Sequence, residues 1–499
     1  MMVRYAREGA APASWQTEGQ SPRDSRDTSP MSGERMSSVD RAWLLMDRPA
    51  NPMTIVGLIV LERPLELGPL RELIGRRLLA FPRFRQTPVA GVLEGSWIET
   101  PAFSLDDHVR PAALPPPGSQ RQLELLAGEL AGTPFPPGRP LWSFHLVGRY
   151  RGGSAVIVRI HHCYADGVAL LKVLLALADP EGARANPLQG PPATQAAPTD
   201  TGQGLRQVVL DALRQGAGLL EEGLHYTLHP GEAGGLAGQA LGIGSELLRL
   251  ATLPGDPSTR LKRPLCGSRR LAWARALLLE EVHTIGRFLG CTVNDVLIST
   301  LAGALGRYLE CEGEAVAGLT VRAAVPVNLK PAAVAQPAAD QLSLGNRFGL
   351  VFVELPIGVR HPLERLYTVH TVTKALKRSS QALATFDLLW LVGTLPATVE
   401  EYALSLLSAK VSLVASNLPG PTEALTLAGR RIREVLFWVP QSGSVGAGVS
   451  MLTYCGRVQY GVMADRELIP DPVRLVELLA EEFERLALLV VLGGVALRD

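Results

Sequence analysis

The pattern of apolar and polar positions predicts strands and helices that follow one another along the chain. Residues 53–62 read MTIVGLIVLE, a β-branched run bounded by prolines, which favours a strand. Residues 68–79 place four aliphatic side chains on one helical face, which is typical of an amphipathic helix. Two further strands are expected at 142–149 and 154–160, joined by an Arg-Gly-Gly turn. A helix over 167–178 follows them.

The second part of the chain repeats this mixture of elements after a break. Residues 179–204 are rich in Pro, Ala, Gly and Thr and are interpreted as a linker. An amphipathic helical stretch is expected at 205–225. Further helices are predicted at 279–289, 294–311, 362–378 and 472–491. Further strands are predicted at 319–325, 348–355, 411–416, 445–454 and 457–464.

These elements predict a mixed α/β protein made of two halves joined by a flexible crossover. The first half covers 36–178 and the second covers 205–499. Residues 1–35 are rich in Ser, Arg, Pro, Glu and Gly without periodicity, and they are expected to form a disordered tail. The length of 499 residues fits two or three domains.

Composition narrows the class of partner. Lys plus Arg total 49 and Asp plus Glu total 48, so the net charge is +1. This balance gives no electrostatic reason to expect nucleic acid as a partner. Charged residues make up 19% and the mean hydropathy is +0.14, which suits apolar ligands. The five cysteines form no CxxC pair, which argues against a disulfide framework and fits a reducing compartment. With no signal-like start and no uncharged apolar run of spanning length, we expect a soluble or membrane-surface protein.

The chemistry of the chain centres on HHCYADG at 161–167. Two of only nine histidines are adjacent here, between a predicted strand and a predicted helix. Histidine titrates near neutrality and can accept a proton from a hydroxyl group and return it. Gly167 would allow a φ angle that other residues resist. Taken alone, an adjacent histidine pair is more often structural than catalytic, and the absence of nearby third and fourth ligands argues against a metal site.

The segment HHCYADG resembles the HHxxxDG signature of the chloramphenicol-acetyltransferase-like superfamily. That superfamily includes peptide-synthetase condensation domains and the bacterial bifunctional wax ester synthase/diacylglycerol acyltransferases. Other segments single out the second group, in its own order and over about residues 36–490. They are MSSVDRAWLLMDRPANPM at 36–53, PLW at 140–142, VND at 293–295, VPVNL at 325–329, LGNRFG at 344–349 and SNLPGP at 416–421. Thr54 stands where this family commonly has a histidine, and the N-terminal tail is longer than usual.

The resemblance implies two chloramphenicol-acetyltransferase-like halves with an active-site tunnel between them. It implies that His162 is the general base and that His161 supports it. Asp166 is implied to be structural and to pair with an arginine, for which Arg85 is the candidate; a solvated surface arginine is the alternative.

The resemblance also implies roles for residues outside HHCYADG. Asn294 is either an oxyanion donor or the cap of the helix that follows it. Support of the fold is expected from Pro140, Leu141 and Trp142 beside the histidine loop, and from Asn417, Pro419 and Gly420 in a turn after the strand 411–416.

The implied reaction is transfer of a long-chain fatty acyl group from acyl-CoA to the hydroxyl of diacylglycerol, of a long-chain alcohol, or of both. No cofactor or metal is expected, and Cys163 is not needed as a nucleophile. We expect a cytoplasmic protein, or one bound peripherally to the cytoplasmic face of the membrane or to lipid inclusions. The alternatives are an acyltransferase of condensation type, which takes a carrier-protein thioester, and a non-catalytic lipid-binding protein. The preferred acceptor, the chain length and the oligomeric state do not follow from the sequence.

Overall fold

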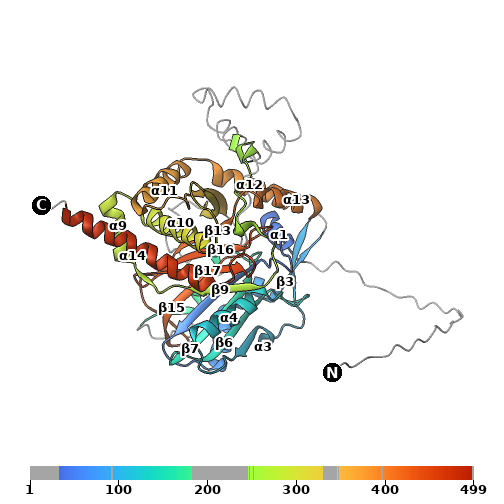
Figure 1. Ribbon diagram of the computed structural model, residues 1–499. Helices are drawn as coiled ribbons and strands as arrows, with labels where there is room; N and C mark the ends of the chain where they lie inside the picture. The colour runs from blue at the N-terminus through green and yellow to red at the C-terminus, as the bar shows by residue number, and fades with distance from the viewer. Residues whose placement is uncertain are drawn as a thin grey trace, which may run out of the picture. The chain divides into compact units, whose positions relative to one another are not determined.

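Two large β-sheets with helices packed around them carry the folded part of the chain (Figure 1). The computed structural model describes residues 33–91, 94–181, 245–246, 248–250, 252–329, 346, 348–394 and 397–496. Residues 1–32 of the predicted tail 1–35, residues 182–204 of the predicted linker 179–204 and the predicted helix at 205–225 lie outside the described residues. Inside the predicted tail, Glu34–Arg35 form a short strand, and the start of the predicted linker belongs to the strand Ala178–Pro180. The structure confirms a mixed α/β fold.

The first sheet has the strand order β5-β6-β7-β2-β15-β14-β8. Its strands are β2 (Thr54–Leu61), β5 (Val109–Ala112), β6 (Trp142–Tyr150), β7 (Gly153–His161), β8 (Ala178–Pro180), β14 (Leu425–Leu427) and β15 (Arg430–Trp438). The central strands β2 and β7 are buried along their whole length. This explains why their sequences are nearly continuous apolar runs rather than an alternation.

The second sheet has the order β10-β17-β16-β13-β11-β12, with β9 also pairing with β17. Its strands are β9 (Arg269–Trp273), β10 (Leu277–Leu278), β11 (Val321–Asn328), β12 (Phe348–Leu355), β13 (Leu413–Pro419), β16 (Ala447–Tyr454) and β17 (Arg457–Asp465). A small third sheet consists of β1 (Glu34–Arg35), β4 (Gly95–Glu99) and β3 (Gln86–Ala90).

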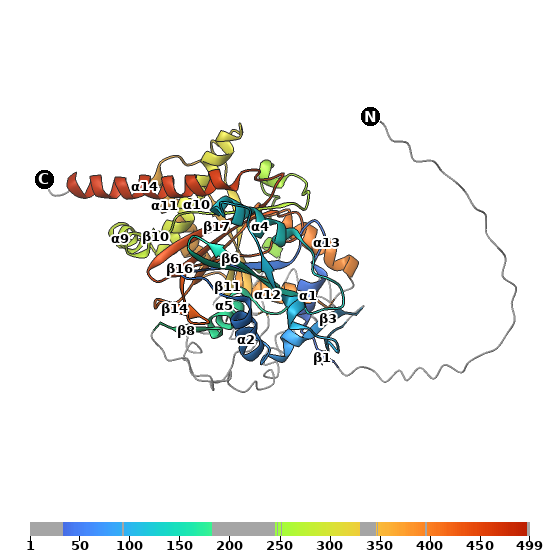
Figure 2. The ribbon, with the colours of Figure 1, turned by 90° about the horizontal axis from the view of Figure 1, so that it is seen from below.

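Helices cover both sheets, and Figure 2 shows the long last helix running across one side of the folded part. The first half contains α1 (Ser38–Leu45), α2 (Leu67–Arg77), α3 (Leu105–His108), α4 (Gln120–Gly132) and α5 (Gly167–Ala176). The second half contains α9 (Leu279–Leu289), α10 (Val293–Cys311), α11 (Pro362–Leu376), α12 (Gln381–Val392), α13 (Ala397–Ser408) and α14 (Pro472–Ala496). Helix α10 is buried over most of its length and forms the centre of the second half.

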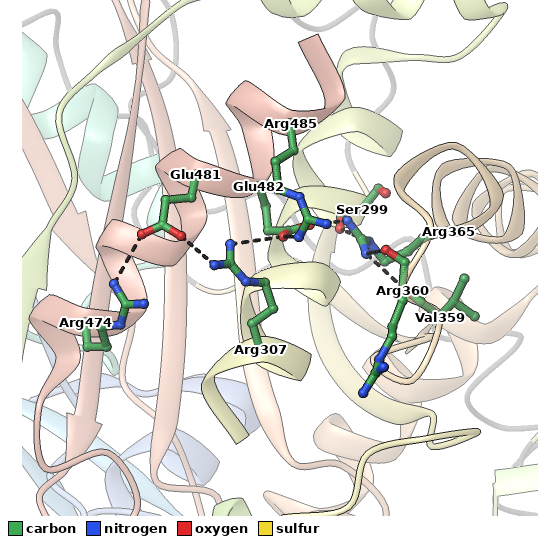
Figure 3. A network of polar contacts seen from close by, with 9 residues as sticks. All are labelled: Ser299, Arg307, Val359, Arg360, Arg365, Arg474, Glu481, Glu482 and Arg485. Atoms are coloured by element: carbon green, nitrogen blue, oxygen red, sulfur yellow. Dashed lines mark hydrogen bonds and ion pairs between the residues drawn. The ribbon is translucent and has the colours of Figure 1, made fainter. Parts of the chain in front are cut away.

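A buried polar network fastens α10, α11 and α14 together (Figure 3). Arg365 of α11 forms an ion pair with Glu482 of α14, and both side chains are almost completely buried. The same arginine donates to the Ser299 carbonyl of α10 over 3.0 Å. Arg307 of α10 adds an ion pair with Glu482 at 3.2 Å. Three helices that are distant in sequence are therefore joined at one buried carboxylate.

The division into two halves at 204 stays a prediction, but the sheets do not follow it strictly. Strands β14 and β15 come from the second half of the sequence and complete the first sheet, where β15 pairs with β2. This crossing connects the two halves through backbone hydrogen bonds.

Several predicted strand ends are displaced by a few residues, and one of these differences moves predicted site residues. The strand predicted at 411–416 runs on to Pro419, because β13 pairs in parallel with β16 as far as Thr453. Asn417 and Pro419 therefore belong to the strand and not to a turn after it.

Within the described residues, no single helix has the length and apolar character needed to cross a membrane. The consecutive helices α9 and α10 reach that standard only together, and they are bent by 99°.

Candidate active site

The histidine pair lies where β7 ends and the loop to α5 begins. The backbone N–H of His161 donates to the Leu141 carbonyl over 2.9 Å. The backbone N–H of His162 donates to the Met53 carbonyl over 2.8 Å, on the opposite neighbouring segment. Because the loop is held on both sides by main-chain hydrogen bonds, the position of the His162 ring is set by the sheet.

Aromatic rings enclose the imidazole of His162. The Trp43 ring of α1 stacks on it, with ring centroids 4.1 Å apart and an angle of 23° between the planes. Phe348 lies at the start of β12, and the centroid of its ring is 5.7 Å from the centroid of the His162 ring. Nδ1 of His162 is buried without a hydrogen-bond partner among the described residues, which leaves Nε2 as the nitrogen able to meet a ligand.

Electrostatics keeps this ring neutral. Burial, reinforced by the neighbouring His161, lowers the pKa of His162 to about 3. A neutral imidazole retains the lone pair that accepts a proton, so the ring is in the form that a general base requires.

His161 is buried and is oriented by hydrogen bonding rather than facing a ligand. Its Nδ1 accepts from the backbone N–H of Cys163 over 3.1 Å. The remaining ring N–H is therefore on Nε2, which lies 3.7 Å from the Asp47 carboxylate. Burial alone would raise the pKa of Asp47, but His161 and the Met53 N–H outweigh it and hold that pKa below its usual range. This arrangement suits a supporting residue.

Asp166 and Gly167 form the start of α5. The Asp166 carboxylate accepts from the backbone N–H of Ala169 over 2.8 Å, so it is the N-cap of the helix. Gly167 is not at a positive φ angle, so the expectation of an unusual backbone conformation there is wrong. A Cβ atom at Gly167 would lie 3.4 Å from the Leu418 side chain, at the limit of ordinary van der Waals contact, so Leu418 lies beside the start of α5.

The expected pairing of Arg85 with Asp166 is also wrong. Arg85 forms an ion pair with Glu99 of β4 at 3.2 Å and donates to the Leu79 carbonyl. The hairpin of β3 and β4 brings Glu99 opposite Gln86, immediately beside Arg85, and so provides the nearer carboxylate.

Asn294 does not cap α10. The cap is Thr292, whose side chain accepts from the Asp295 N–H over 3.2 Å, while Asp295 accepts from the Thr292 N–H over 2.9 Å. Asn294 is two residues beyond this cap, and its side-chain oxygen accepts from the Asn417 amide over 3.3 Å. Its predicted role as an oxyanion donor stays a prediction.

The other predicted support residues lie close to the loop or to β13. Trp142 is fully buried, and its indole donates to the Phe84 carbonyl over 2.8 Å. The backbone N–H of Leu141, next to Pro140, donates to the Tyr164 hydroxyl over 3.0 Å. At Gly420 a Cβ atom would lie 2.1 Å from the Thr453 carbonyl, so only glycine fits there.

A narrow apolar cavity of about 120 Å³ opens against His162. Trp43, Asp166 and Gly167 line it on the histidine side. Its remaining wall is mainly aliphatic and aromatic and comes from β11–β13, α12 and α13, including Phe348, Leu350, Leu389, Leu404, Val414 and Leu418. Such a wall suits an alkyl chain.

Two contributors to this site were quoted in sequence motifs but not recognised as site residues. Trp43 comes from the segment 36–53, and Asn346 comes from LGNRFG. The Asn346 amide donates to the His162 carbonyl over 3.0 Å and to the Asp40 carboxylate over 2.8 Å. Burial raises the pKa of Asp40, against the opposing charge of Arg83. Their presence in motifs shared with a family was the signal that could have identified them.

Candidate metal ligands occur elsewhere among the described residues. Cys291, Asp295 and His370 bring ligand-type atoms within 4.8 Å of one another. The Asp295 oxygens already accept from Thr373, over 2.6 Å, and from the Thr292 N–H. We therefore interpret this group as part of the cap of α10.

The fold and the site together define a class. Two mixed sheets, a strand-to-helix loop carrying a neutral histidine, and an apolar cavity at that histidine are the features of an acyltransferase with a chloramphenicol-acetyltransferase-like fold. The comparisons with known proteins agree with this class.

The chain belongs to the wax ester synthase/diacylglycerol acyltransferase family. The family's catalytic-domain model matches residues 36–297, and its C-terminal-domain model matches residues 344–487. A probable diacylglycerol O-acyltransferase of Mycobacterium tuberculosis is 28% identical over 466 residues, which cover 88% of this chain and 95% of that protein. A putative diacylglycerol O-acyltransferase of Mycobacterium bovis is 28% identical over 397 residues, covering 78% and 81%. The protein is thus an acyltransferase enzyme.

Solved structures confirm the fold. The wax ester synthase/diacylglycerol acyltransferase from Marinobacter aquaeolei VT8 aligns with a TM-score of 0.65 at 20% identity, covering 92% of this chain and 99% of that one. The first condensation domain of the calcium-dependent antibiotic synthetase aligns with a TM-score of 0.53 at 15% identity, covering 92% and 96%. The predicted resemblance to this superfamily is therefore confirmed at the level of fold.

Proposed function

We propose that this enzyme transfers a long-chain fatty acyl group from acyl-CoA to the hydroxyl of diacylglycerol, of a long-chain alcohol, or of both. The observation that carries the proposal is the position of the His162 ring in the wall of an apolar cavity. The names of the relatives as diacylglycerol O-acyltransferases support the acceptor class.

The proposed mechanism uses His162 as a proton carrier. Nε2 of His162 takes the hydroxyl proton as the acceptor oxygen attacks the thioester carbonyl. The tetrahedral intermediate then collapses, the carbon–sulfur bond breaks, and His162 returns the proton to the CoA sulfur. The products are an ester and free CoA, so no cofactor and no covalent acyl-enzyme are required. Holding the thioester and the acceptor hydroxyl side by side at His162 supplies much of the rate through proximity.

Cys163 is a poor nucleophile in this setting. It is fully buried, and burial raises the pKa of its thiol well above the usual value. It is also absent from the lining of the cavity at His162.

The location that we propose is the cytoplasm, with peripheral attachment to the membrane or to lipid inclusions. Exposed apolar side chains near the end of α14 support such a contact: Leu488, Val491 and Leu492 are 56–62% exposed.

The test compares donors, acceptors and a histidine variant. Purified protein is incubated with palmitoyl-CoA and either hexadecanol or dipalmitoylglycerol, and both CoA thiol release and the lipid product are measured. We expect ester formation with at least one acceptor and a loss of kcat of about 10²-fold or more in His162→Ala, because general-base steps contribute that much.

His283→Ala is the matched control, because His283 is exposed on α9 and does not line the cavity. Both variants must keep the wild-type circular dichroism spectrum. A His162→Ala enzyme that keeps more than about a tenth of the wild-type kcat would contradict the general-base role. Activity with an acyl-carrier-protein donor but not with acyl-CoA would favour the condensation type.

A further inference from the structure

A second, larger cavity of about 810 Å³ is rich in arginine. It lies between β15 of the first sheet and β16 and β17 of the second. Five arginines line it against only two carboxylates, Glu62 and Glu434. The arginines are Arg151, Arg275, Arg431, Arg433 and Arg457. In a chain whose net charge is +1, this is a local excess of positive charge.

Two of the five arginines are paired. Arg431 forms ion pairs with Glu62 and with Glu181, each at 3.1 Å. Arg151 donates to the Gln120 amide oxygen over 2.7 Å and lies 3.8 Å from Glu434. These contacts use up both carboxylates of the cavity.

The other three arginines have no such partner. Within the part of the chain that the structure describes, no carboxylate lies within 4.0 Å of Arg275, Arg433 or Arg457. Within the described ranges, the one hydrogen bond of the Arg433 side chain goes to the Arg151 carbonyl, over 3.4 Å. Arg275, Arg433 and Arg457 are all exposed. Exposed guanidinium groups without a carboxylate partner bind phosphate strongly, because each offers paired N–H donors.

The arginine cavity adjoins the cavity at His162. Leu452 of β16 lines the arginine cavity, and Leu418 of β13 lines the His162 cavity. The two leucines are directly paired in the parallel ladder between these strands. Neighbouring strands are about 4.8 Å apart, so only one strand spacing separates the two linings. Leu418 also packs against Gly167, at the start of α5.

The unpaired charge is close to this junction. Arg457 lies opposite Tyr454, and Tyr454 is two residues beyond Leu452 on β16. At a rise of about 3.3 Å per residue, that is roughly 7 Å along the strand. A ligand with phosphates at one end and a reactive group at the other end of a flexible arm could thus occupy both cavities.

We propose that the arginine cavity binds the phosphate-bearing nucleotide end of acyl-CoA, with Arg275, Arg433 and Arg457 as its phosphate ligands. The thioester then reaches His162 past Leu452 and Leu418. This inference rests on the proposed function, and it adds the site and the residues that recognise the donor.

The experiment uses the full chain carrying Arg275→Ala, Arg433→Ala and Arg457→Ala together. The matched control carries Arg287→Ala, Arg378→Ala and Arg466→Ala, which remove the same charge from exposed positions outside both cavities. Binding of free CoA is measured by isothermal titration calorimetry at constant ionic strength. We expect the affinity for CoA to fall at least about tenfold in the cavity variant and to stay unchanged in the control, because charge-assisted hydrogen bonds are the strong ones.

Kinetics gives a second, independent measurement. The KM for palmitoyl-CoA should rise in the cavity variant. The kcat/KM for palmitoyl-N-acetylcysteamine, a thioester without phosphates, should not change. Wild-type CoA affinity in the cavity variant overturns the inference. So does selective loss of binding to phosphatidylglycerol vesicles with CoA binding intact, because the cavity would then recognise a lipid headgroup.

Failure of the proposed function gives a different result. If the wild-type protein forms no ester but binds CoA through the three arginines, the acyl-transfer proposal fails and the assignment of the phosphate site stands.

Discussion

His162 owes its properties to a few side chains that enclose it. Trp43 stacks on the ring and excludes water from one face, which is the burial that lowers the pKa of the imidazole. Asn346 fixes the His162 carbonyl and is itself fixed by Asp40. The ring is therefore both neutral and oriented before a substrate arrives, and less reorganisation is required during the reaction.

The lowered pKa of His162 predicts the pH dependence of the enzyme. Because the ring stays neutral down to a pKa of about 3, kcat/KM should show no acid limb centred near 6.5. The unfolded chain binds a proton on this histidine below about 6.5, while the folded chain does not, so stability should fall as the pH decreases from there. Initial rates from pH 5 to 8, with thermal unfolding at each pH, check both points. An acid limb at 6.5 in protein that remains folded would contradict the neutral-ring argument.

Helices α5 and α10 each begin behind a side chain that satisfies one of the first free N–H groups of the helix. Helix α5 begins behind the Asp166 cap, which fixes the end of the histidine loop. Helix α10 begins with a reciprocal capping box between Thr292 and Asp295. Asp295 also accepts from Thr373 of α11, so this cap joins two helices.

Removal of the cap of α10 should destabilise the fold. Thr292→Ala should lower the free energy of unfolding by about 0.5–2 kcal/mol, the usual cost of a lost N-cap. Thr371→Ala is the matched control, because Thr371 is exposed within α11 and bonds only to its own helix. Urea unfolding, monitored by circular dichroism, measures the stability of both variants. Equal midpoints for the two variants would show that the box contributes nothing.

At the scale of the whole molecule, two types of contact join distant parts of the chain. Strand β15 brings residues from the second half of the sequence into the first sheet. The buried pair of Arg365 and Glu482 then fastens α11 to α14, as Figure 3 shows. A buried carboxylate with several arginine partners is stable only as long as every partner remains.

Loss of one member of this pair should be costly. Glu482→Ala should lower the free energy of unfolding by about 3–5 kcal/mol, because it leaves Arg365 charged and buried. Glu477→Ala removes an exposed ion pair with Arg474 and should cost at most about 1 kcal/mol. The double variant Arg365→Met with Glu482→Leu should regain most of the loss. Denaturant unfolding of the three variants measures these changes in the free energy of unfolding. A Glu482→Ala protein as stable as Glu477→Ala would contradict the predicted cost of leaving Arg365 unpaired.

Local patterns in the sequence determined much of the framework. Helix α9 and strand β12 lie at the predicted residues, and β6, β7, α5, α10 and α14 differ by a few residues at their ends. These elements have an apolar period or turn residues of their own. The sequence likewise located His161 and His162 on a loop between a strand and a helix, because both flanking patterns are local.

Only the tertiary structure decided which residues meet. Nothing in the local sequence of 430–438 indicates that β15 pairs with β2, almost four hundred residues earlier in the chain. The partners of Arg85, the cap of α10, and the positions of Trp43 and Asn346 beside His162 depend in the same way on segments brought together from afar. Periodicity reports the neighbours of a residue along its own element, whereas the energy of these contacts comes from surfaces that exist only after the sheets and helices have packed.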